Sequence, residues 1–116
     1  DIRVDESPQP LVELRRLLNI SRAYRHMDKG DEYITAKEFD KANAEYARAA
    51  ELAPGNPEVL FWHAVTLVTA GEVERALPIF KEVFAADSSW RTLVPRLVSS
   101  DLLPNDKGLI EKIVGQ

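Results

Sequence analysis

The sequence has no cysteine, only five glycines and no long uncharged apolar run. The absence of cysteine excludes disulfide frameworks and thiolate metal sites. Because glycine supplies most positive-φ turns, its scarcity disfavours a fold of many strands and favours helices. The 15 Lys and Arg are outnumbered by 19 Asp and Glu, which gives a net charge of −4. The excess of cations that binds phosphate backbones is therefore missing, and a nucleic-acid partner is not expected.

A chain of 116 residues, 45% of them hydrophobic, is long enough to bury one core. Residues 1–9 contain only two aliphatic side chains, so we expect an extended lead-in or linker there and a single domain over residues 10–116. The chain lacks a signal peptide pattern and a membrane-spanning run, which predicts a soluble protein of unknown compartment with no membrane partner. Because it starts at Asp1 rather than Met, we expect a piece of a longer protein.

The spacing of apolar residues predicts an all-α fold. Ser7 and Pro8 supply a start signal for a first helix that runs to near Thr35. Its apolar residues recur at steps of three, four or seven, which predicts one buried face made of Leu11, Leu14, Leu17, Leu18, Tyr24, Met27 and Ile34. Further helices are expected at about 38–52, 58–70, 72–86, 90–99 and 107–114. Pro78 should bend the fourth helix, and Asp106 should cap the last.

An internal repeat appears when the chain is shifted by 34 residues, so that residues 23–56 align with residues 57–90. Small residues align with small ones, and large apolar residues with large ones, at the interior positions. Examples are Gly30 with Ala64, Ala42 with Ala76, and Tyr46 with Phe80. Gly30 inside the first helix costs up to about 1 kcal/mol relative to alanine, unless a neighbour packs closely enough to need the missing side chain. This agreement is typical of stacked helix-turn-helix units.

The repeat resembles the tetratricopeptide repeat. The residues that carry the resemblance are Gly30, Tyr33, Ala42, Tyr46, Ala49 and Pro54 in the first unit, and Ala64, Leu67, Gly71, Ala76 and Phe80 in the second. The resemblance implies two units, residues 23–56 and 57–90. The long first helix is then expected to cap one end of the stack, and a helical C-terminal cap, residues 91–116, the other.

A second set of short blocks resembles a bacterial module. The blocks are Arg3-Val4-Asp5, Pro8-Gln9-Pro10, Leu14-Arg15-Arg16-Leu17-Leu18, Pro57-Glu58 running into Phe61-Trp62, and Leu102-Leu103-Pro104. That module is the C-terminal domain of a family whose N-terminal domain is similar to N-terminal-nucleophile hydrolases. The resemblance implies peptidoglycan binding.

Residues for catalysis are scarce. His26 and His63 are 37 positions apart and have no acidic partner at ligand spacing, so they are interpreted as surface or packing residues. Acidic pairs such as Glu72 with Glu74 are interpreted as solvent-exposed residues at a helix N-terminus, where negative charge is favourable. No phosphate loop or nucleophile motif is present. We therefore expect a non-enzyme with no cofactor and no metal.

A binding surface is the favoured alternative. In a tetratricopeptide stack the first helix of each unit lines a concave groove, which implies a groove formed by Tyr24, Met27, Asp28, Asp31, Phe61, Trp62, Val65 and Thr69. Adjacent helix positions point about 100° apart, so Phe61 and Trp62 cannot both face one core, and one aromatic should be partly exposed. The alternative is that the first helix or the cap covers Trp62.

Three functions are compatible with these sequence features. The first is a protein or peptide interaction module, including docking on an upstream domain or self-association. The second is binding of cell-wall glycan or muropeptides, and the third is an accessory domain that orients a hydrolase-like partner. Arg15, Arg22 and Arg25 give the first helix a basic side, which is either a solvated face or a contact for an acidic partner.

Overall fold

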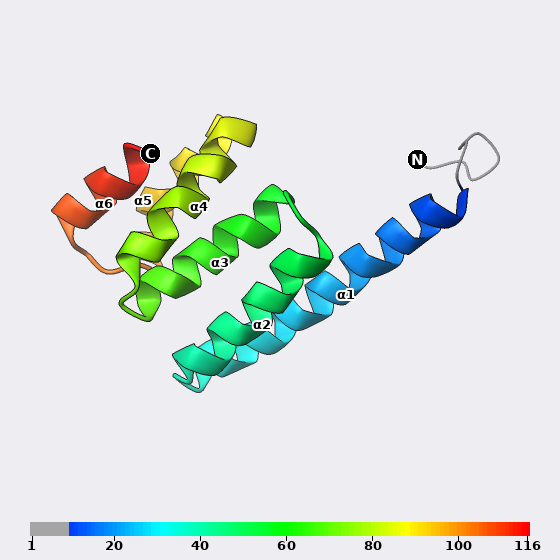
Figure 1. Ribbon diagram of the computed structural model, residues 1–116. Helices are drawn as coiled ribbons and strands as arrows, with labels where there is room; N and C mark the ends of the chain where they lie inside the picture. Colours follow the sequence, from blue (N-terminus) through cyan, green and yellow to red (C-terminus); the bar gives the residue numbers. More distant parts are fainter. Residues whose placement is uncertain (1–9) are drawn as a thin grey trace.

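Two antiparallel helix pairs stack side by side, and shorter helices follow them at the C-terminal end. The computed structural model describes residues 10–116 (Figure 1). The elements are α1 (Pro10–Thr35), α2 (Phe39–Leu52), α3 (Pro57–Thr69), α4 (Val73–Ala86), the 3-10 helix η2 (Ser88–Thr92), α5 (Leu93–Ser99) and α6 (Lys107–Val114). No strand occurs in this part of the chain. The predicted all-α helix-turn-helix fold is confirmed. The expected start signal at Ser7 and Pro8 and the lead-in over residues 1–9 lie outside the described residues.

Helix ends follow the local chemistry of the sequence. Asn56 caps α3, because its Oδ1 accepts a hydrogen bond from the Val59 N–H at 3.2 Å. Asp106 caps α6 in the same way, through the Leu109 N–H at 3.2 Å. Gly71 lies just beyond the end of α3. Its φ of 85° is in the left-handed region that glycine favours, and this conformation turns the chain out of the helix. The predicted fifth helix is divided into η2 and α5, and α4 continues through Pro78 without a break.

The larger core lies between α3, α4 and the C-terminal helices. Phe61 is fully buried at its centre, with ring centroids 4.9 Å from Trp90 and 5.8 Å from Phe80. Val94 of α5 and Ile113 of α6 are also fully buried in this cluster. The C-terminal helices therefore cover the apolar side of the second helix pair, and Trp90 fills the joint between them.

The smaller core lies between α1, α2 and the start of α3. It is built on Ala23 and Met27 of α1, which pack against Tyr46 and Ala49 of α2. Small residues let the two backbones approach closely. His26 has an acidic partner that the sequence did not reveal, since its Nδ1 lies 2.7 Å from Glu45 Oε1 on α2.

The first half of α1 departs from the predicted single buried face. A helix of 26 residues is about 39 Å long, whereas the 14 residues of α2 span about 21 Å, so α1 continues past its partner (Figure 1). Met27 and Ile34 do face α2. Tyr24 and the four leucines of residues 11–18 are instead exposed. The leucines lie beyond the end of α2, where nothing in the described part of the chain covers α1.

Acidification is expected to destabilise the protein through His63. This α3 side chain is buried, and burial, followed by the charge of Arg75, lowers its pKa below the ordinary value of 6.5. Between the lowered pKa and 6.5 the unfolded chain binds more protons than the folded one, so stability falls as the pH drops through this window. One proton limits the slope to about 1.4 kcal/mol per pH unit. Urea unfolding from pH 7.5 to 5 should show a steeper loss for the wild type than for His63→Gln. Parallel profiles would contradict the prediction.

Candidate binding groove

A cavity of about 660 Å³ opens between α1, α3 and the loop that follows α5. Its volume falls in the range of ligand-binding clefts, roughly 300–1,000 Å³. We call it the groove. It is lined by Tyr24, Met27, Asp28, Asp31, Ile34 and Thr35 of α1, Lys37 of the α1–α2 turn, Phe39 and Tyr46 of α2, Glu58, Trp62, Val65, Thr66 and Thr69 of α3, and Asp101 and Leu102 of the loop.

The structure brings together seven of the eight residues expected there. They are Tyr24, Met27, Asp28, Asp31, Trp62, Val65 and Thr69. Phe61 is the exception, since its exposed fraction is 0% and it lies in the core on the other side of α3. The half-buried aromatic of the pair is Trp62, whose ring meets Phe61 edge to face at 5.2 Å. Trp62 therefore connects the groove to the core behind it.

Some lining residues were not anticipated from the sequence. Glu58 had a usable signal, because a shift of 34 residues places it at the position of Tyr24. Ile34 and Thr35 continue the face of α1 that was already named. Asp101 and Leu102 come from a loop beyond the repeat, which no spacing rule connects to the groove.

Two tyrosines hold carboxylates at the edge of the groove. Tyr24 donates a hydrogen bond to Glu58 Oε2 at 3.1 Å, and Tyr46 donates one to Asp31. Burial, and then the hydrogen bond to Asp31, raises the pKa of Tyr46. Burial and Glu58 likewise raise the pKa of Tyr24. Both phenols stay protonated, so they remain donors that fix the orientation of the two carboxylates.

The groove carries a negative charge over an apolar floor. Asp28, Asp31, Glu58 and Asp101 line it, and Lys37 is the cation among the lining residues. Apolar side chains of Met27, Val65 and Leu102 lie between these charges. A cationic group attached to an apolar stem is complementary to such a surface.

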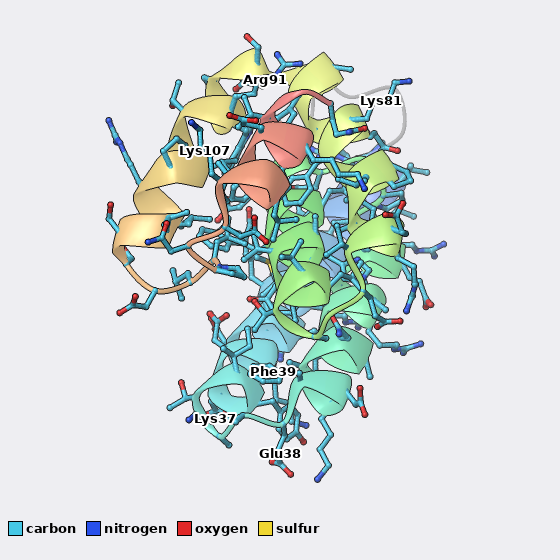
Figure 2. The ribbon with its side chains drawn as sticks, turned by 90° about the vertical axis from the view of Figure 1, so that its left-hand side faces the viewer. Lys37, Glu38, Phe39, Lys81, Arg91 and Lys107 are labelled. Atoms are coloured by element: carbon cyan, nitrogen blue, oxygen red, sulfur yellow. The ribbon has the colours of Figure 1, made fainter. Side chains whose placement is uncertain are left out.

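Two lining residues adopt a strained backbone. Lys37 and Asp101 both have φ of 61°, a left-handed conformation that glycine adopts at lower cost. Each follows a helix and closes it with paired backbone bonds, as in Leu102 N–H to Leu97 C=O at 2.9 Å. Figure 2 shows Lys37 beside Phe39 at the α1–α2 turn, at the opposite end of the molecule from Arg91. Both conformations are explained by the way the helices end, and they place Lys37 and Asp101 on the lining of the groove.

Comparison with known families agrees with this architecture. The tetratricopeptide repeat profile matches residues 33–96, which is 64 of the 116 residues. The chain belongs to the tetratricopeptide repeat family. The matched segment runs from the end of α1 into α5 and contains all of α2, α3, α4 and η2. Searches of curated proteins and of solved structures each returned no match.

The family supports a helical-repeat module for protein interaction, since tetratricopeptide repeats are generally non-catalytic binding modules. Within residues 10–116, no cluster of three His, Asp or Glu side chains is arranged to hold a metal ion. Along the same residues, no helix combines the length and the apolar character needed to cross a membrane.

Proposed function

We propose that this tetratricopeptide protein is a non-catalytic module whose groove binds a short peptide segment with an Arg or Lys next to a large apolar residue. The observation that supports this most directly is a half-buried tryptophan, Trp62, in a cavity of about 660 Å³ lined by four carboxylates. The apolar floor would take the hydrophobic side chain. The carboxylates would pair with the cation in a site partly shielded from water.

Asp28 and Asp101 are the carboxylates best suited to the cation. Asp31 and Glu58 already accept hydrogen bonds from Tyr46 and Tyr24. Within residues 10–116, neither Asp28 nor Asp101 has a Lys, Arg or His within ion-pair distance. A guanidinium that enters the groove therefore finds two carboxylates that have no ion-pair partner among the described residues.

Asp101→Asn is expected to weaken binding of an Arg-Leu-containing peptide by about tenfold, because a charge-assisted hydrogen bond contributes roughly 1.5 kcal/mol. Asparagine tolerates the left-handed backbone, so the loop keeps its form. Glu82→Gln, on the exposed face of α4, is the matched control and should leave the affinity unchanged. Fluorescence anisotropy with Arg-Leu, Glu-Leu and Arg-Ser peptides measures both effects. Equal binding of all three peptides, or no binding at all, would contradict the proposal.

A glycan is the second candidate ligand. Half-buried Trp62 and Thr69 line the groove together, and an aromatic ring beside a hydroxyl suits stacking on a sugar ring. Peptidoglycan fragments also contain amines that the acidic rim would attract. Co-sedimentation with purified sacculi tests this function. Depletion of the wild type but not of Trp62→Ala would support it, and no depletion at micromolar protein would contradict it.

A further inference from the structure

The first half of α1 carries a row of leucines that residues 10–116 leave exposed. Leu11, Leu14 and Leu18 are 78%, 48% and 50% exposed. At 100° per residue these three side chains lie within about 60° of one another, nearly opposite the face that carries Ala23 and Met27. We call them the leucine row. With Leu17, which is also exposed, the leucines at this end of α1 form an apolar patch on the order of 400 Å², the size of the largest patch on a typical monomer and often a functional one.

Cations flank the leucine row. Arg15, Arg16, Arg22 and Arg25 against Glu13 give residues 10–25 a charge of 4 − 1 = +3, within a chain of net charge −4. Arg16 pairs with Glu13 at 2.7 Å, and the other three arginines have no carboxylate partner within residues 10–116. Arg15, Arg22 and Arg25 also lie on the same side of the helix as the leucines. The surface is therefore a basic, leucine-bearing helix.

The groove is the complementary surface on the same molecule. It offers apolar side chains around Trp62 and the carboxylates of Asp28, Glu58 and Asp101. We infer that the leucine row of one copy docks in the groove of a second copy, with its arginines facing the acidic rim. This inference rests on the proposed function of the groove and names its occupant.

The occupant must come from another molecule. Residues 24–35 of α1 form one wall of the groove, and the leucine row lies on the same continuous helix. A rigid helix cannot turn back into a groove that it helps to form. A row and a groove in separate copies can meet without any change in fold.

A symmetric pairing of two leucine rows is disfavoured by charge. It would bring the arginines of both copies together, and like charges repel in a partly desolvated contact. Docking a row in a groove instead pairs the arginines with the carboxylates of Asp28, Glu58 and Asp101. Such head-to-tail contacts build chains unless the rotation between copies closes a ring.

Sedimentation velocity of the full chain tests the inference. The wild type should show an average mass that rises with concentration in the range of tens to hundreds of micromolar. The row variant, Leu14→Asp with Leu18→Asp, should stay monomeric, and so should the groove variant, Trp62→Ala with Asp101→Asn. Val12→Asp makes the same kind of change on another side of α1, at a residue that is 60% exposed, and should behave as the wild type does.

Mixing the two monomeric variants is the decisive measurement. The row variant keeps an intact groove, and the groove variant keeps an intact row. An equimolar mixture should therefore form a dimer and no larger species, because the free row and the free groove of that dimer are both mutated. A mixture that stays monomeric while the wild type associates would overturn the head-to-tail contact. A wild type that is monomeric at every concentration, yet binds Arg-Leu peptides, would overturn this inference and leave the proposed function standing. Failure of both association and peptide binding would overturn both.

Discussion

Phe61→Ala is expected to lower the free energy of unfolding by about 4 kcal/mol, and Trp62→Ala by about half as much. Phe61 is 0% exposed and contacts the rings of Trp62, Phe80 and Trp90. Removing its ring leaves a cavity at the point where α3, α4 and η2 meet. Trp62 is half-buried, so part of the space it leaves is already open to the groove. Urea unfolding of the two variants at neutral pH measures the difference.

Phe61→Leu provides the control for this comparison. Leucine keeps most of the apolar volume, so the loss should fall to about 1.5 kcal/mol. Because Phe61 does not line the groove, Phe61→Leu should also bind Arg-Leu peptides as the wild type does, whereas Trp62→Ala should not. If Trp62→Ala proved the more destabilising of the two alanine variants, the assignment of one ring to the core and the other to the groove would be wrong.

Much of the fold could be predicted from the sequence because its signals are local. Asn56 precedes α3 and Asp106 precedes α6. Each side chain accepts a hydrogen bond from a backbone N–H in the first turn, which has no partner inside the helix. The 34-residue shift places small and large interior residues in register, and a stack of helix pairs is the simplest way to bury them. These features depend on spacing along one helix or between neighbouring helices.

The distinction between Phe61 and Trp62 could not be predicted from periodicity. Helix α3 has buried residues all around it, from Val59 to Val68, because it packs against α2 on one side and α4 on the other. A helix that is apolar on every side has no periodic signal to show which side chain faces a groove. The rule that adjacent side chains diverge predicted one exposed ring, but not which one.

Two further features depend on contacts that are distant in sequence. Asp101 reaches the groove because the loop after α5 meets the end of α3, where Thr69 Oγ1 lies 3.5 Å from the Leu102 carbonyl oxygen, and the repeat does not encode this contact. The leucine row follows steps of three, four and seven residues like those of a core face, yet at 100° per residue it lies nearly opposite Met27. Periodicity does not show which face of α1 a second helix covers. Helix α2 packs on the Met27 face and ends at Leu52, so the described residues leave the leucine row exposed.

Gly30→Ala is expected to lower the free energy of unfolding by about 2 to 3 kcal/mol, although alanine is the better helix former by about 1 kcal/mol. A Cβ atom at Gly30 would lie 2.6 Å from Cε2 and 2.7 Å from Cδ2 of Tyr46. The Tyr46 ring cannot swing aside cheaply, because it is buried and its hydroxyl bonds to Asp31. The clash therefore has to be relieved by separating α1 from α2.

Gly108→Ala is the matched control for this prediction. Gly108 lies in the exposed first turn of α6, where the nearest atom to an added Cβ is Asp106 Oδ1 at 3.6 Å. Without a clash, this substitution should raise stability by up to about 1 kcal/mol. Thermal unfolding of both variants should give shifts of opposite sign. Since Tyr46 also lines the groove, Gly30→Ala should weaken peptide binding as well, and a stabilised Gly30→Ala variant with full affinity would contradict the close packing of α1 on Tyr46.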